Sequence, residues 1–154
     1  MKRLLMLFAL LGGFAACSDG EKNEAPTPAP TEKLLFTGLL EATPDQESRF
    51  EAFAEEGITM ELQAAGERCY HLLMPEIKFV PQMPWLSIEV RGLEDTAQGE
   101  AIRFEVAETI PYFMGAPYDS FPISNLRGEY NPSTQSLVVD FDCNTMQVHF
   151  AGTK

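Results

Sequence analysis

Cys17 is the residue whose position points most directly to chemistry. Two basic residues precede the apolar run Leu4–Leu11, and Phe14-Ala15-Ala16 then leads to Cys17, after which the sequence becomes polar. A basic start, an apolar stretch and small residues before a cleavage site are typical of a secretory signal. Cleavage directly before Cys17 therefore puts a thiol on the first residue of the exported protein.

This segment resembles the lipobox of bacterial lipoproteins, whose cysteine is diacylated on sulfur and, after cleavage, acylated on its new amine. The resemblance implies a signal peptide over residues 1–16 and a lipoprotein held at the membrane through Cys17 by fatty acyl groups such as palmitate. Phe14 departs from the family pattern, which prefers an aliphatic residue. The alternatives are a chance cysteine after an ordinary signal, or a membrane span. The apolar run is too short for a span, which needs ~20 residues.

Residues 17–32 are predicted to be a lipidated tether. They contain the stretch Pro26–Pro30 and no apolar run, a composition typical of disordered, semi-extended chain. Asp19, Glu21 and Glu24 also resemble the export signals that send some lipoproteins to the cell surface. The resemblances together imply a protein of the bacterial cell envelope, in the outer membrane on its periplasmic face or at the cell surface.

Net charge excludes one class of partner. The sequence has 11 basic and 23 acidic side chains, and loss of Lys2 and Arg3 with the signal leaves 9 against 23, a formal charge of −14. Nucleic acid phosphates and anionic headgroups repel such a body. We therefore expect no nucleic acid partner, and we expect lipid rather than charge to hold the protein at the membrane.

The histidines do not indicate a metal or catalytic site. His71 and His149 are the only two, and neither has the spacing of a metal-binding motif. No nucleophile elbow, phosphate loop or Cys-x-x-Cys is present, and the methionines have no ligand spacing. We expect no metal, no cofactor and no enzyme activity. Strand alternation places Cys143 inward and Cys69 outward, which argues against a disulfide between them.

One concentration of aromatic residues suggests a binding surface. Ile110–Tyr118 is apolar for a loop, and Pro81–Trp85 is a second such piece. Aromatic loops at the mouth of a barrel often contact a ligand. The candidate ligand-binding residues are Trp85, Glu108, Tyr112, Phe113 and Tyr118. The alternative is that these aromatic side chains cap the end of the fold and bury one another.

Period-two alternation dominates the rest of the chain and predicts an all-β domain over residues 33–154. Eight strands are expected around residues 34–42, 58–64, 70–74, 86–90, 102–106, 123–130, 137–141 and 146–150. Turn-rich pieces separate them, so the sheet is predicted to be antiparallel. Closure of eight such strands into an up-and-down barrel removes the exposed edges.

Two hairpin registers follow from the turns. With Asn144-Thr145 as a two-residue loop, Cys143 lies opposite Met146, Phe141 opposite Val148, and Val139 opposite Phe150. With 132–135 as the preceding loop, Leu126 lies opposite Phe141, Gly128 opposite Val139, and Tyr130 opposite Leu137. In both hairpins the apolar residues then lie on the same, inner face of the sheet. His149 lies across from Asp140 on the outer face.

A short helix is predicted over residues 44–56, between the first two strands. Thr43 is a candidate N-cap, Pro44 suits the first helical position, Gln46 completes a capping box, and Gly57 ends the run. A strand remains the alternative, because Phe50-Ala52-Ala54 also alternates. A helix here would lie across one end of the barrel.

The strand order resembles the calycin-like, or lipocalin-like, domain of bacterial lipoproteins. The resemblance rests on that order together with Tyr70–Met74, Ile88–Leu93 and Val148–Lys154. It implies an eight-stranded barrel that holds a small hydrophobic or amphipathic molecule, without catalytic residues. The alternative function is a filled barrel that acts as an accessory or adhesion-type surface lipoprotein and contacts a macromolecule through its loops. How the inward side chains fill the interior distinguishes the two.

Overall fold

The computed structural model describes residues 32–154. The predicted signal peptide, Cys17 and the tether up to residue 31 lie outside the described residues. Within residues 32–154 the structure contains no helix long and apolar enough to cross a membrane.

The described chain is all-β, as predicted, and forms ten strands rather than eight. The strands are β1 (Lys33–Pro44), β2 (Phe53–Gly66), β3 (Cys69–Ile77), β4 (Leu86–Glu94), β5 (Ile102–Thr109), β6 (Tyr112–Phe113), β7 (Ala116–Pro117), β8 (Ile123–Asn131), β9 (Ser136–Cys143) and β10 (Met146–Thr153). The two additional strands, β6 and β7, are two residues long and lie in the segment that was expected to be a loop.

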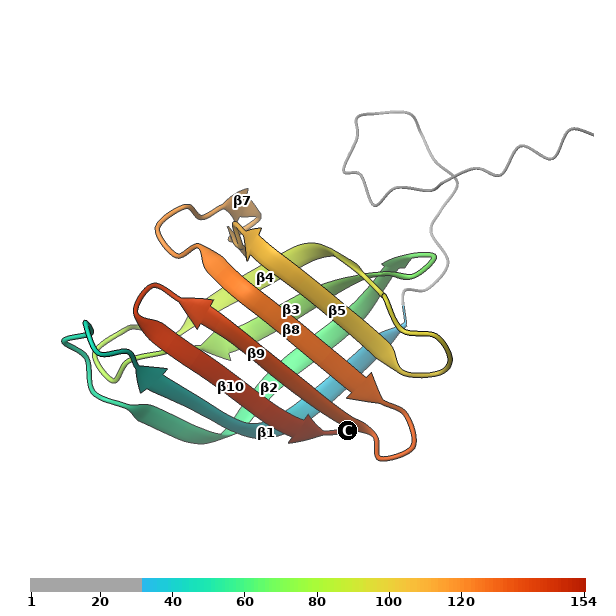
Figure 1. The fold of residues 1–154 in the computed structure, drawn as a ribbon, viewed down its shortest axis with the longest axis horizontal. Coiled ribbons are helices and arrows are strands. Elements are labelled where there is room, and N and C mark those ends of the chain that lie inside the picture. Colours follow the sequence, from blue (N-terminus) through green and yellow to red (C-terminus); the bar gives the residue numbers. More distant parts are fainter. Residues whose placement is uncertain (1–31) are drawn as a thin grey trace, which may run out of the picture.

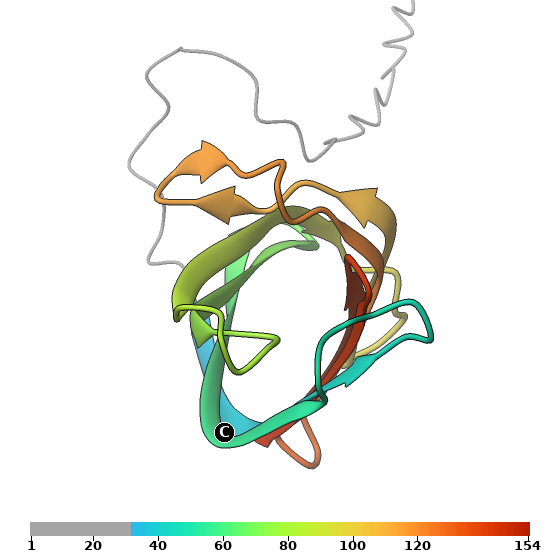
Figure 2. The same ribbon diagram turned by 90° about the vertical axis from the view of Figure 1, so that its left-hand side faces the viewer.

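The strands form one antiparallel sheet that curls around a single core (Figures 1 and 2). Their order is β5-β8-β9-β10-β1-β2-β3-β4-β6-β7, so the first and last long strands pair with each other. No ladder pair joins β4 to β5 within residues 32–154. The two strands are instead held at one end, where the amide of Thr96 donates to the carbonyl of Arg103 (2.7 Å) and the amide of Arg103 donates to Asp95 Oδ1 (3.0 Å).

The predicted hairpin registers are confirmed, with one exception. β9 and β10 pair as expected, from Cys143 opposite Met146 to Val139 opposite Phe150. β8 and β9 pair as expected at Gly128 and Tyr130. The exception is Leu126, because a register shift lies between Ser124 and Arg127, next to a left-handed residue, Asn125 (φ 51°). A bulge absorbs one extra residue there and restores alternation beyond it.

The helix predicted over residues 44–56 is wrong. Thr43 and Pro44 still belong to β1 and lie opposite Gln147 and Met146 of β10. The amide of Asp45 then donates to the carbonyl of Thr145 (2.9 Å), and β2 already begins at Phe53. Strand pairing on both sides therefore leaves only residues 45–52 for the connection, and tertiary pairing overrides the local capping signals.

The interior of the curled sheet is filled by side chains. Every long strand contributes inward residues that are at most 2% exposed, namely Phe36, Leu40, Met60, Leu62, Leu72, Met74, Val90, Phe104, Leu126, Val139, Phe141 and Phe150. The connection between β3 and β4 adds Phe79, whose ring meets that of Phe141 edge-on at 5.7 Å, and Val80. Figure 2 shows this connection, in light green, folding across the ring of strands. It plugs the end at which a helix was expected.

Of the two described cysteines, Cys143 has the orientation that strand alternation predicts and Cys69 does not. Cys143 is free and buried as expected, so it forms no disulfide with Cys69, and burial raises the pKa of its thiol to about 12. Cys69 is also buried, although alternation predicts an outward side chain. It lies opposite Gly66, directly after a register shift between Ala64 and Gly66, where the alternation of β2 and β3 is interrupted.

Candidate functional site

The predicted binding residues gather at one end of the sheet. Because the strands alternate in direction, the connections 45–52, 78–85 and 110–122 and the turn 144–145 lie at the end opposite Lys33. We call this the far end. The candidate residues Trp85, Tyr112, Phe113 and Tyr118 are all in these connections or at their edges.

Tyr112 is held on the outer face of β4 rather than at an opening. The β6–β7 hairpin pairs with β4, with Tyr112 opposite Glu89 and Phe113 opposite Ile88. The guanidinium of Arg91 lies 4.1 Å from the centroid of the Tyr112 ring and bonds Glu89 Oε2 at 3.0 Å. A cation over the face of a ring is attracted to it. Arg91 therefore fastens the hairpin to the sheet.

Phe113 and Tyr118 stack with a third ring that the sequence analysis did not single out. The centroids of Phe113 and Tyr118 are 5.4 Å apart, and those of Tyr118 and Phe121 are also 5.4 Å apart. Phe113 and Phe121 both pack against the core. These distances are typical of stabilising ring contacts. The stack therefore links the β6–β7 hairpin to the segment that precedes β8.

Among residues 32–154, the most exposed large apolar side chain is Met114, which is not one of the five predicted candidates. Met114 is 88% exposed at the tip of the β6–β7 hairpin, followed by Gly115. Both residues have positive φ, 51° and 80°, as a two-residue hairpin turn requires. Left-handed backbone is unfavourable for a methionine, so the turn places an apolar side chain in water at a local cost. Two turn residues between short apolar pieces are the signal that could have revealed it.

Trp85 belongs to a different cluster from Tyr112. The ammonium of Lys78 lies 4.5 Å from the centroid of the Trp85 ring and 5.0 Å from that of Phe53. Trp85 precedes β4, whereas Tyr112 lies opposite Glu89, roughly 13 Å further along the strand at about 3.3 Å per residue. Trp85 remains 46% exposed. Glu108 is exposed on β5 opposite Ser124, and so the five candidate residues do not converge on one opening.

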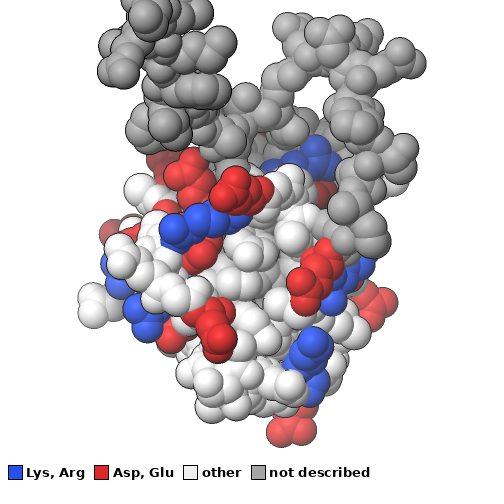
Figure 3. All heavy atoms as spheres, turned by 90° about the vertical axis from the view of Figure 1, so that its right-hand side faces the viewer, with Lys and Arg blue, Asp and Glu red and all other residues white. Residues whose placement is uncertain are grey.

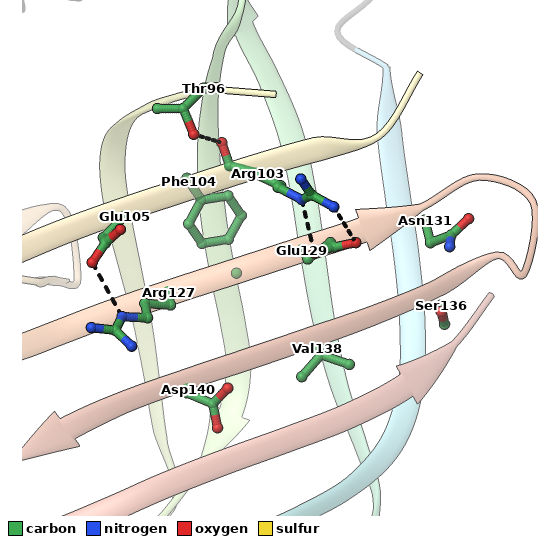
Figure 4. A pocket seen from close by; sticks show the side chains of 11 residues that line it. Thr96, Arg103, Phe104, Glu105, Arg127, Glu129, Asn131, Ser136, Val138 and Asp140 are labelled. Carbon is green, nitrogen blue, oxygen red and sulfur yellow. Dashed lines mark hydrogen bonds and ion pairs between the residues drawn. The ribbon is translucent and has the colours of Figure 1, made fainter. Parts of the chain in front are cut away.

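One hollow on the outer face lies over β5, β8 and β9 (Figure 4). It has a volume of about 520 Å³ and is lined mainly by charged and polar side chains. Arg103 bonds Glu129 through Nε at 2.9 Å and through a terminal nitrogen at 3.2 Å, and Arg127 bonds Glu105 at 3.2 Å. The hydrogen bond from Arg103 lowers the pKa of Glu129. The arginines and glutamates that line this hollow therefore already neutralise one another.

A second hollow of about 530 Å³ surrounds the pair His149 and Asp140. The pair occupies the register that the sequence predicted, with His149 Nδ1 2.6 Å from Asp140 Oδ1. Across five strands the register aligns Glu105, Arg127, Asp140, His149 and Glu41. Exposed pairs of this kind contribute roughly 0–1 kcal/mol. Among residues 32–154, no cluster of three histidine, cysteine or acidic side chains could hold a metal ion.

A third hollow, of about 600 Å³, opens between β2 and β3 at the far end. It is lined by Glu55–Thr59 of β2, by Pro75 and Glu76 of β3, and by Trp85. We call it the β2–β3 wedge. Unlike the other two hollows, it lies where two neighbouring strands separate.

At the end of the sheet where Lys33 lies, opposite the far end, acidic and basic side chains are mixed. Figure 3 shows acidic and basic side chains interspersed around an uncharged central area there. Two of the ion pairs near this end are Lys33 with Glu61 (2.9 Å) and Arg68 with Asp95 (3.4 Å). Lys33 and Arg68 thus already have acidic neighbours.

Comparison of the chain with protein-family models, with curated proteins and with solved structures gave no match.

Proposed function

We propose that this protein is a lipid-anchored accessory protein of the bacterial cell envelope. Acylated Cys17 and the tether hold a filled, lipocalin-like eight-stranded barrel, with β6 and β7 as an added hairpin. The barrel contacts a macromolecular partner through the loops of the far end. This function requires no cofactor and no catalytic residue.

The filled interior is the observation that carries the proposal. A cavity for a small molecule would leave the side chains that line it accessible to a water-sized sphere, and ligand pockets start at about 300 Å³. Each of the eight long strands instead contributes at least one inward residue that is at most 2% exposed. Phe79 and Val80 fill the far end above them. This filling supports an accessory role over the binding of a small apolar ligand, the first function that the sequence suggests.

The exposed apolar residues of the far end support a contact there. Phe50, Trp85 and Met114 are each exposed by 46% or more and come from three separate connections. Scattered surface apolar residues are common, but aromatic and methionine side chains are enriched at the centres of protein interfaces. All three lie at the far end, opposite Lys33, where β1 begins.

The experiment places a photoreactive phenylalanine analogue in the full chain, produced in bacteria, at Met114 or Phe50 and, as a matched control, at Val138 on the outer face of β9. We expect discrete cross-linked species from the two far-end positions and none from Val138. In the same cells a radiolabelled fatty acid should mark the wild type and not Cys17→Ala. Co-purification of one small apolar molecule per chain, seen by native mass spectrometry, would overturn the proposal in favour of ligand binding.

A further inference from the structure

The β2–β3 wedge is a gap between two neighbouring strands whose ladder ends early. Ladder pairs between β2 and β3 end at Glu61 and Leu73. Beyond them, within residues 32–154, the far-end part of β2 pairs with β1 alone and that of β3 with β4 alone. Figure 1 shows the two strands diverging toward the far end. Pro75 lies where the ladder would continue, and it has no N–H to donate.

The wedge is lined by the edge of β2 rather than by one of its faces. Glu55–Thr59 are five consecutive lining residues. Successive side chains of a strand point to opposite faces, so an unbroken run of lining residues marks the edge itself. Backbone N–H and C=O groups on that edge face the hollow without a neighbouring strand. Five residues at 3.3 Å each give an edge of about 17 Å.

The charge of the wedge selects the chemistry of an occupant. Three of its eight lining residues, Glu55, Glu56 and Glu76, are acidic, and none is basic. Trp85 forms the opposite rim, where Lys78 lies 4.5 Å from its ring centroid. Because Lys78 already lies over the Trp85 ring, the attraction for cationic side chains of an occupant comes from the three carboxylates.

We propose that the β2–β3 wedge binds an extended, basic segment of a partner protein, which adds as a strand to the free edge of β2. Main-chain hydrogen bonds to the edge hold the segment, and its lysine or arginine side chains meet the three glutamates. This proposal rests on the proposed function, because it gives the partner a chemistry and a docking position. A second copy of this chain fits less well, because the sequence as a whole is strongly acidic.

The single tryptophan of the chain makes the wedge directly observable. Trp85 is the only tryptophan, so intrinsic tryptophan fluorescence reports on the rim of the wedge alone. The probe is a synthetic ten-residue peptide in which lysine alternates with valine or threonine, and its matched control carries glutamate in place of lysine. Added to the full chain, the lysine peptide should change Trp85 emission saturably, and the glutamate peptide should not. Higher salt should weaken the binding, because the attraction is electrostatic.

Two kinds of substitution separate charge from strand addition. The double variant Glu56→Gln/Glu76→Gln should bind the lysine peptide about tenfold more weakly than the wild type does. The matched variant Glu67→Gln/Glu100→Gln removes two exposed carboxylates outside the wedge and should leave binding unchanged. N-methylation of alternate amides of the peptide should abolish binding in one register and be tolerated in the other, since alternate residues of a strand face the same neighbour.

The outcomes that overturn the inference differ from those that overturn the proposed function. Equal binding of lysine and glutamate peptides, no binding of either, or N-methylation effects without alternation would each remove the wedge as a strand-addition site. Cross-links from Met114 and Phe50 would in that case still support a partner at the far end. Conversely, a stoichiometric apolar ligand would overturn the accessory function, whatever the peptide does.

Discussion

The two sides of the sheet differ in how continuous their ladders are. On one side, β9 pairs with β10 and β10 with β1 through eight consecutive residue pairs each. On the other side, β3 has register shifts against both β2 and β4, and its pairing with β2 ends early. We call these the continuous side (β9, β10 and β1) and the interrupted side (β2, β3 and β4). The continuous side has no edge for another strand, whereas the interrupted side has one at the wedge.

Local chemistry explains the difference. The continuous side is set by the two-residue turn Asn144-Thr145, in which Asn144 has a positive φ of 53°. Tight turns of this kind fix the register of the strands they join. On the interrupted side, Pro75 cannot donate to a ladder, Gly92 has a φ of 69°, and an eight-residue connection joins β3 to β4 without fixing their register.

The largest expected contrast is in stability. Phe150→Ala, on the continuous side, removes a fully buried ring and should lower the free energy of unfolding by about 3–5 kcal/mol. Trp85→Ala, on the rim of the wedge, should lower it by about 1 kcal/mol or less, because the side chain is half exposed. Urea denaturation followed by circular dichroism measures both. Equal losses would mean that the wedge is a part of the core.

Two glycines sharpen the comparison at a smaller scale. A Cβ at Gly128, on β8 next to the continuous side, would lie 2.0 Å from the ring of Phe104, so Gly128→Ala should cost about 1–3 kcal/mol through overpacking. A Cβ at Gly57, in the wedge, meets nothing within 4 Å, and Gly57→Ala should cost about 1–2 kcal/mol through its positive φ alone. Thermal or urea unfolding of both variants gives these costs.

A second substitution, Phe104→Leu, distinguishes overpacking at Gly128 from backbone strain at Gly57. Because the smaller side chain makes room above Gly128, Phe104→Leu should lower the free energy of unfolding less in the Gly128→Ala background than in the wild type. Its cost should be unchanged in the Gly57→Ala background, because the two sites share no contact. A rescue of Gly57→Ala by Phe104→Leu would contradict this assignment.

The smallest expected effect concerns pH on the outer face. Arg103 lowers the pKa of Glu129 in the folded protein, chiefly through their hydrogen bond. A carboxyl group whose pKa is lowered on folding adds stability above its ordinary pKa, and that stability is lost as the pH falls through the folded value. In Arg103→Gln the pKa of Glu129, followed by NMR titration, should rise toward its ordinary value. An unchanged pKa would mean that another group sets the pKa of Glu129.

Because the side chains of Arg103 and Glu129 are both exposed, the pH dependence of the free energy of unfolding should hardly change in this variant.

The sequence predicts the β9–β10 part of the continuous side well. Inward alternation in β9 and β10, together with Asn144-Thr145, places Val139, Phe141 and Phe150 at their observed register. The pairing of His149 with Asp140 follows from the same turn. Period two and a short loop are sufficient there, because each residue has one possible partner once the turn is fixed.

The interrupted side and the candidate site are predicted less well. Phe79 plugs the interior from a connection with no period, and no local pattern distinguishes it from a loop residue. The wedge depends on how far β2 and β3 remain paired, which is a tertiary property, although Pro75 is its visible sign in the sequence. The false helix arose because Thr43, Pro44 and Gln46 satisfy local capping rules, while pairing of β1 with β10 decides the conformation.

The unpaired junction between β4 and β5 has a consequence for how the chain folds. The strands from β1 to β4 are neighbours in sequence, and so are β5 and β8 to β10, so each group can form through short-range contacts. What unites the groups is the β1–β10 ladder, whose partners are more than a hundred residues apart in sequence. Closing so long a loop is entropically costly and slow. Until β10 has been synthesised, this edge of β1 has no partner among the strands β2–β9.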